Sequence, residues 1–232
     1  MVKSKIIKDL VNDSADTTTT LKRAKVLISD IGNIDISRWL DYEISGYPDD
    51  ADIPSYRKVH GILIGSYVKD SMASCMRWNN VSIPLGEMPD DTKELLLSVE
   101  FHEGIEALKK LVEKSQSVGS EISKNIPADY FPTITHFNND PYMIITSARV
   151  IVSEHNLSNI FSIIENKLLD ILIILEKEFG CLDELDIDTS VKSEEEIKAI
   201  NNRIFVLVYN DNSVSVGDGN KIKNSTIVSE IK

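Results

Sequence analysis

Apolar residues recur every three or four positions over much of the chain, which is the spacing of one face of an α-helix. The longest stripe runs from Leu157 to Phe179 and stops at Gly180. A second apolar face on this helix indicates either burial between layers or sharing with another subunit. Shorter stripes with capping residues at their ends predict further helices over residues 2–13, 17–31, 35–45, 92–115 and 193–202.

β-branched residues and glycines replace the helical spacing in the middle of the chain. Residues 59–68 and 81–85 therefore predict two strands, which form a hairpin across a long connection. Residues 116–142 hold three prolines and predict irregular structure with one short helix at most. These expectations define an α+β fold that is mainly α, in which a helical domain over residues 1–181 carries a small β-hairpin insertion.

The chain changes character after residue 181. Residues 182–196 are rich in Asp and Glu, so we expect an acidic linker over residues 182–202 that ends in a short helix. Residues 203–232 hold apolar, mostly β-branched positions that two turn clusters separate: Ile204–Tyr209, then Val214 and Val216, then Ile222 and Ile227. This pattern predicts a β meander as a C-terminal appendage.

The appendage has two apolar faces, and so short a segment cannot bury both of them alone. We therefore expect it to join copies of the chain into a homo-oligomer, most simply a dimer, through strand pairing. The alternative is that the appendage folds back onto its own helical domain. The residues expected to carry the association are Phe205, Leu207, Tyr209, Val214, Val216 and Ile222.

Composition narrows the classes of function. The chain of 232 residues has a formal net charge of -12, and an acidic chain repels phosphate, so we expect no nucleic-acid partner. The two cysteines and four histidines show no metal-ligand spacing, which predicts no metal and no cofactor. Glu165, Lys167 and Asp170 interrupt the most apolar stretch, so we expect no membrane span. Without an apolar signal segment, the expectation is a cytoplasmic protein with two partly buried thiols.

One local constellation combines aromatic, acidic and basic side chains. Trp39 and Glu43 lie four residues apart and so share a helix face. Tyr47 follows the same helix, and Tyr56 and Arg57 come just before the first expected strand. We predict that Glu43 and Arg57 form a salt bridge or a close hydrogen-bonded pair. Two interpretations stay open: a buried structural corner, or a ligand pocket with an aromatic wall and a cation.

The same residues carry a resemblance. The order Trp-Leu-x-x-Glu-Ile-x-Gly-Tyr, followed by Pro-x-Tyr-Arg, resembles the AbiTii family of bacterial proteins, over residues 3–180 and most strongly over 36–57. The resemblance implies a role in abortive infection, a defence against phage, and it brings no catalytic residues with it. The tail resembles β appendages with a Gly-Asp-x-Asn-x-Ile pattern on bacterial conflict proteins. The matching positions of the family motif are Trp39, Leu40, Glu43, Ile44, Gly46, Tyr47, Pro54, Tyr56 and Arg57.

Three functional hypotheses follow from these observations. The first is a defence protein without catalysis, a self-associating sensor or interaction module that binds a phage or host protein or a small-molecule ligand. The second is an enzyme of unknown reaction with a pocket around the Trp39, Glu43, Tyr56 and Arg57 corner. The third is a phage counter-defence protein that sequesters a ligand or an effector. A filled corner favours the first hypothesis, and an open cleft with perturbed ionisable groups favours the second.

Overall fold

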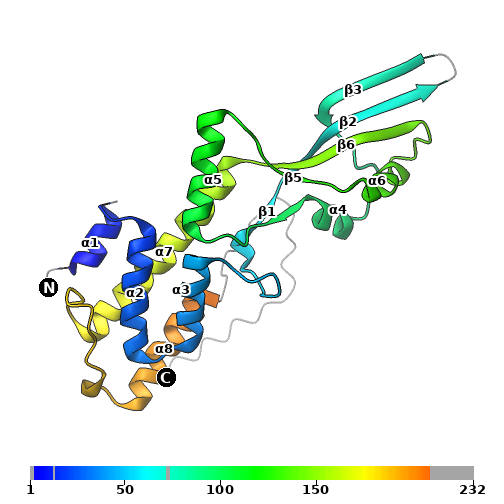
Figure 1. The fold of residues 1–232 in the computed structure, drawn as a ribbon. Coiled ribbons are helices and arrows are strands. Elements are labelled where there is room, and N and C mark those ends of the chain that lie inside the picture. The colour runs from blue at the N-terminus through cyan, green and yellow to red at the C-terminus, as the bar shows by residue number, and fades with distance from the viewer. Residues whose placement is uncertain (1–2, 13, 72–73, 210–232) are drawn as a thin grey trace.

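The computed structural model describes residues 3–12, 14–71 and 74–209, which form a helical body with a β-sheet extending from it (Figure 1). The mainly α, α+β fold expected from the sequence is confirmed. The helices of the body are α1 (Lys5–Val11), α2 (Thr17–Ile31), α3 (Ile34–Ser45), α5 (Ile105–Val118), α7 (Glu154–Phe179) and α8 (Glu194–Tyr209).

The described residues also form two antiparallel sheets. The larger has the strand order β3-β2-β6-β5, and the smaller pairs β1 with β4. In Figure 1 the hairpin of β2 and β3 extends away from the helical body. The strands are β1 (Lys58–His60), β2 (Ile62–Ser71), β3 (Ser74–Ser82), β4 (Ser98–Glu100), β5 (Ile122–Asn125) and β6 (Met143–Val152). Shorter helical elements are η1 (Ser55–Arg57), α4 (Asp90–Leu97), η2 (Ala128–Tyr130), α6 (Phe131–Phe137) and η3 (Thr189–Val191).

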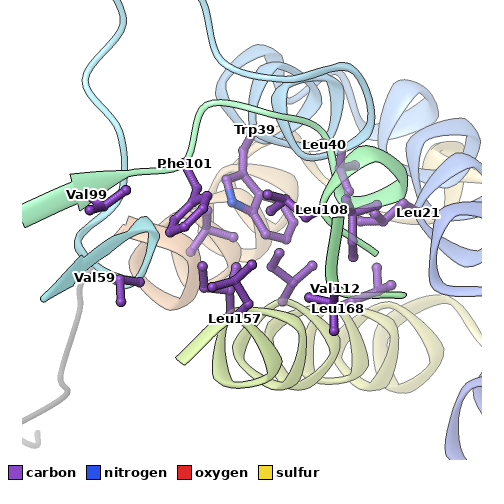
Figure 2. Packing of buried hydrophobic residues seen from close by; sticks show 14 of the residues in the cluster. Leu21, Trp39, Leu40, Val59, Val99, Phe101, Leu108, Val112, Leu157 and Leu168 are labelled. Carbon is purple, nitrogen blue, oxygen red and sulfur yellow. The ribbon is translucent and has the colours of Figure 1, made fainter. Parts of the chain in front are cut away.

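The long helix α7 organises the core. The stripe that begins at Leu157 and ends at Leu175 is buried, and the helix contacts α1, α2, α5 and α8. Figure 2 shows Leu157 and Leu168 of α7 facing side chains that α3 and α5 contribute. Burial of this face therefore comes from the chain's own helices. The second apolar face is less enclosed, because Ile173 is 39% exposed.

The helix expected over residues 92–115 is interrupted. It ends at Leu97, the strand β4 follows, and α5 begins directly after Gly104. A Cβ atom at Gly104 would lie 2.4 Å from the carbonyl oxygen of Ile44, so only glycine lets the chain come this close to the end of α3. The approach takes the chain out of the helix and places residues 101–104 against α3.

The strand β6 is missing from the sequence-based expectation, and residues 116–142 contain β5 and α6 besides loops. Met143 and Ile145 are buried at odd positions of β6, whereas Ala148 and Val150 are buried at even positions. The change of phase coincides with a register shift between β2 and β6. Such a bulge moves the buried face by one residue, which breaks the alternation that a sequence pattern would have to follow.

The C-terminal prediction needs correction. Residues 203–209, including Phe205, Leu207 and Tyr209, are not a strand but the last turns of α8. Val214, Val216 and Ile222 lie outside the described residues. Packing decides in favour of the helix, because the buried residues of α8 repeat at every fourth position and face α7 and α3. These buried residues are Ile200, Ile204 and Val208.

The acidic segment before α8 is also more ordered than a solvated linker. Leu182 and Ile187 are buried, and the backbone N–H of Ile187 donates to Asp30 Oδ2 at 3.1 Å. Ser193 and Glu196 form a capping box, in which each side chain accepts from the other residue's backbone N–H. The acidic side chains therefore cover and cap a segment whose apolar residues join the core. Cys75 and Cys181 are both exposed, which corrects the expectation of partly buried thiols.

The N-terminal segment is tied to the end of α7 by a buried carboxylate. Glu176 Oε1 accepts from the backbone N–H of Ser4 at 2.6 Å and from its hydroxyl at 2.7 Å. Glu176 Oε2 lies 2.5 Å from the ammonium of Lys3. The hydroxyl oxygen of Ser4 in turn accepts from the backbone N–H of Leu182 at 3.0 Å. One carboxylate thus holds together three segments that are distant in sequence.

We expect Glu176→Gln to lower the free energy of unfolding by about 1–3 kcal/mol at neutral pH, because charge-assisted hydrogen bonds are lost. Burial acts to raise the pKa of Glu176, but the hydrogen bonds from Lys3 and Ser4 outweigh it and lower the pKa to about 2. A lowered pKa stabilises the fold above the unfolded pKa of about 4.3, and this stabilisation is lost as pH falls towards the folded value. Urea unfolding at neutral pH and at about pH 3 checks this.

The difference between wild type and Glu176→Gln should shrink at the lower pH. Glu184→Gln is the matched control, because Glu184 is an exposed carboxylate beyond the same helix. Its unfolding should stay close to wild type at both pH values. A gap for Glu176→Gln that is as large at acid pH as at neutral pH would contradict the role given to this carboxylate.

Candidate functional site

The five residues of the sequence constellation meet in a closed polar corner between α3 and η1. Glu43 Oε1 accepts from the hydroxyls of Tyr47 and Tyr56, each at 2.6 Å. Glu43 Oε2 accepts from Arg57 Nη2 at 2.5 Å, so the predicted pair is confirmed. Trp39 Nε1 donates to the hydroxyl oxygen of Tyr56 at 2.9 Å. Every carboxylate oxygen in the corner therefore has at least one strong donor.

Arg57 extends the corner to the segment that follows β4. Its Nη1 donates to the carbonyl oxygens of Phe101 at 3.0 Å and Glu103 at 2.7 Å. Its guanidinium carbon lies 4.8 Å from the centre of the Tyr47 ring, which is a cation–π contact. The side chains of Glu43 and Arg57 have no exposed surface. The buried ion pair thus joins α3 to residues 101–103.

Charge states in the corner are fixed by its burial and by Glu43. Burial raises the pKa of Tyr47, and the neighbouring carboxylate of Glu43 raises it further. Burial and the same carboxylate raise the pKa of the half-buried Tyr56. Burial acts to lower the pKa of Arg57, but attraction to Glu43 outweighs it and the pKa is raised. Both tyrosines and the arginine therefore keep their protons at neutral pH and act as permanent donors.

The corner is filled rather than hollow. Trp39 is buried beside Phe101 in the core, as Figure 2 shows. Cavities of about 380 to 910 Å³ among the described residues are lined by other side chains than those of the corner. Of the two interpretations open at the level of sequence, the geometry favours the structural corner over the pocket with an aromatic wall.

A groove of about 910 Å³ lies next to the corner, and no sequence pattern predicts it. All three residues of β4 and three residues of β5 line it, together with side chains of α4 and α5. Lys58 and Glu100 form an ion pair at 2.9 Å on its wall, and the hydrogen bond from Lys58 lowers the pKa of Glu100. His102 Nδ1 is buried there without a hydrogen-bond partner among the described residues. Tertiary structure alone brings these residues together, since β4 and β5 are far apart in the sequence.

Three of the six predicted oligomerisation residues lie in the described part of the chain. Phe205 and Tyr209 lie on the outer side of α8, 41% and 43% exposed, with ring centres 4.7 Å apart. Leu207 is half-buried against the core. The remaining three, Val214, Val216 and Ile222, lie outside the described residues.

In the described part of the chain, His, Cys, Asp and Glu side chains do not gather in a group of three or more that could hold a metal ion. None of the described helices is both long and apolar enough to cross a membrane.

The fold and the corner define an α+β protein whose α3, η1 and post-β4 segments are joined by one buried ion pair. The AbiTii family model matches residues 3–201, and the chain belongs to this family. The name of the family denotes abortive infection, a bacterial defence against phage. Neither the curated proteins nor the solved structures contain a match to this chain.

We expect Glu43→Gln to lower the free energy of unfolding by about 3–5 kcal/mol, because it leaves the charge of Arg57 buried without a counter-charge. The double variant Glu43→Gln/Arg57→Met should lose less than the sum of the two single variants, since it removes both buried charges. Denaturant unfolding of all three variants measures the coupling.

Glu106→Gln is the matched control, because Glu106 forms an ion pair with Lys110 in which both side chains are more than half exposed. Loss of this pair should change stability by less than about 1 kcal/mol. Equal losses for Glu43→Gln and Glu106→Gln would show that the buried pair does not stabilise the fold as argued.

Proposed function

We propose that this chain is a self-associating interaction module of anti-phage defence that acts through binding and assembly rather than through catalysis. The closed corner supports a role without catalysis, because its ionisable groups bind one another and the Glu43 and Arg57 side chains have no surface that a substrate could reach. Membership of the AbiTii family supports the biological setting. A phage protein, a host protein or a small molecule would then act on the module by changing its assembly.

The observation that carries the proposal is an exposed apolar patch where α3 and α8 meet. We define the α3–α8 patch as Ile34, Phe205, Val206 and Tyr209, which are between 41% and 72% exposed. The hydroxyl of Tyr209 donates to the carbonyl oxygen of Asp35 at 3.0 Å and fixes the aromatic rings beside the first turn of α3. Aromatic rings held in place lose little entropy on binding, which makes them good anchors of an interface.

Charges around the α3–α8 patch suit contact between two copies. Arg38 and Asp35 form an exposed ion pair next to Tyr209. In a two-fold symmetric contact each copy brings the same acid and the same base, so opposite charges can face each other. The net charge of -12 opposes association only weakly at physiological salt, because charges more than about 8 Å apart are screened. The association residues Phe205 and Tyr209 thus keep their proposed role, in a helix rather than in a strand.

The enzymatic alternative has weaker support. This alternative requires a pocket at Trp39, Glu43, Tyr56 and Arg57. These side chains instead form hydrogen bonds with one another. The phage counter-defence alternative is opposed only by the defence role that the family name denotes.

We expect Phe205→Ser/Tyr209→Ser to turn an oligomer of the full chain into a monomer at micromolar concentration, because the patch loses its aromatic anchors. Light scattering coupled to size exclusion measures the mass, and phage plating on cells that express each variant measures protection. The variant should lose both assembly and protection.

Val118→Ser is the matched control, since Val118 is an exposed apolar residue at the end of α5, outside the α3–α8 patch. It should keep the wild-type mass and protection. The proposal fails if the wild-type chain is a monomer at this concentration, or if the double variant keeps the wild-type mass.

A further inference from the structure

The strand β5 borders the groove with an edge that lacks a partner among the described residues. It is the last strand of the larger described sheet, and within that sheet it pairs with β6 alone (Figure 1). The five consecutive residues 120–124 all line the groove. Because successive side chains of a strand point to opposite faces, lining by consecutive residues indicates that β5 turns an edge to the groove, not a face.

The register of β5 on β6 identifies the peptide groups of this edge. In an antiparallel pair, residues that exchange hydrogen bonds alternate with residues whose N–H and carbonyl groups point away from the partner strand. The N–H of Ile126 donates to the carbonyl oxygen of Ala148 on the β6 side. Two positions earlier, Lys124 therefore bonds to β6 as well, whereas Ser123 and Asn125 direct their peptide groups to the free edge. Both of these residues are exposed.

Peptide groups at the exposed edge of a strand are a template for a further strand. An extended segment laid along β5 would bond to the peptide groups of Ser123 and Asn125 and add a strand to the sheet. Because β5 is only four residues long, main-chain hydrogen bonds alone would hold such a segment weakly. The rest of the affinity has to come from side chains of the segment that the groove receives.

The groove offers apolar surface to these side chains. Leu95 of α4 lines the groove and is 76% exposed. Leu111 of α5 also lines it and is half-buried. The helix α4 has no buried residue, so the side chain of Leu95 does not belong to the core. Aliphatic side chains of a docked segment would remove this surface from water, which favours binding.

The charges of the groove favour a basic segment. Carboxylates outnumber lysines in the lining by five to three. Glu100 is paired with Lys58, and Glu121 is paired with Arg149, which lies outside the lining. The net charge of -12 adds attraction for a basic segment at longer range. Three exposed carboxylates of the lining form no ion pair within the described part of the chain: Asp91, Glu94 and Glu103.

We propose that the groove is a docking site for an extended segment of a second protein, one that combines basic with aliphatic side chains and pairs with the edge of β5. Main-chain hydrogen bonds to Ser123 and Asn125 set the position of the segment, and its side chains supply specificity. Its basic residues neutralise the unpaired carboxylates, and its aliphatic residues cover Leu95 and Leu111.

This inference goes beyond the proposed function. The residues of the α3–α8 patch do not line the groove, so docking of a second protein at β5 does not require that two copies of the chain associate. The two surfaces can therefore be tested separately.

A synthetic peptide of alternating lysine and valine, added to the full chain, tests the proposal. When extended, this peptide carries its lysines on one face and its valines on the other. Amide hydrogen exchange followed by NMR should show that the amides of Ser123 and Asn125 exchange rapidly in the free chain. Saturating peptide should slow both by about tenfold or more, because it covers the edge. The amide of Lys124 should exchange slowly in both states, since it already bonds to β6.

Removal of one donor from the edge tests the strand pairing itself. Ser123→Pro deletes an N–H that points away from β6, so the pairing of β5 with β6 should persist while the peptide binds about tenfold more weakly. Ser123→Ala is the matched control, because it keeps the N–H, and it should bind the peptide as the wild type does. A peptide of the same sequence with every amide N-methylated needs no change in the protein, and it should not bind.

Charge variants test the lining of the groove. Glu94→Lys should weaken binding of the lysine–valine peptide by about threefold, because it replaces an exposed carboxylate of the groove by an ammonium. Glu113→Lys makes the same change at an exposed position of α5 outside the lining and should leave binding unchanged. A peptide that alternates glutamate with valine should bind the wild type more weakly than the lysine–valine peptide.

Slow exchange of the Ser123 amide in the free chain would overturn the proposal, because the edge would already be covered, by this chain or by a second copy. The absence of saturable binding at millimolar peptide would do the same. Binding that leaves this amide in rapid exchange, or that survives N-methylation of the peptide, would show that no strand is added to β5.

The Phe205→Ser/Tyr209→Ser variant separates this inference from the proposed function. It should bind the lysine–valine peptide with wild-type affinity although it does not assemble. A wild-type chain that is a monomer but binds the peptide would contradict the proposed function alone. A wild-type chain that assembles but does not bind the peptide would contradict the docking site alone.

Discussion

The fold depends on the fully buried ion pair of Glu43 and Arg57. Two charges without exposed surface are tolerated only if their remaining donors and acceptors are also satisfied. The hydroxyls of Tyr47 and Tyr56 complete the shell of the carboxylate. The carbonyl oxygens after β4 complete the shell of the guanidinium, so one ion pair holds α3, η1 and that segment together. The strand β4 forms a wall of the groove. The buried pair of Glu43 and Arg57 therefore helps to position the groove, although neither side chain lines it.

The corner is predictable from sequence because its side chains lie close together in the chain. Glu43 is on the same helix face as Trp39, and Arg57 follows after one loop, so spacing and residue type suffice. The other partners of Arg57 are backbone carbonyls, which carry no residue-type signal, so the link to residues 101–103 is not predictable in this way. The groove is hidden for a related reason: a bulge between β2 and β6 changes the phase of the alternation in β6, the strand with which β5 pairs.

At the end of α8 the sequence pattern predicts a strand, whereas the structure has a helix. Residues 204–209 are a continuous apolar run that suits a strand with two apolar faces, but Ile200, Ile204 and Val208 also have the spacing of a helix face. A short run of β-branched residues is compatible with a strand and with a buried helix, so tertiary packing determines which of the two forms. The capping box of Ser193 and Glu196 marks the start of the helix. Contacts with α7 and α3 stabilise the helix up to residue 209. The expectation of mainly helical structure survives because long stripes such as that of α7 fit only one period.

Lys167 of α7 connects the end of α8 to the corner. Lys167 binds the last carbonyls of α8 through its ammonium and lies beside the Tyr56 ring. Tyr56 donates to Glu43, and the pair of Glu43 with Arg57 positions the backbone after β4. A partner that moves the end of α8 therefore changes the surroundings of a side chain that is bonded into the corner. Lys167, Tyr56, Glu43 and Arg57 thus form one continuous chain of contacts from the end of α8 to the backbone beside the groove, and a buried polar network of this kind is rigid while every member is satisfied.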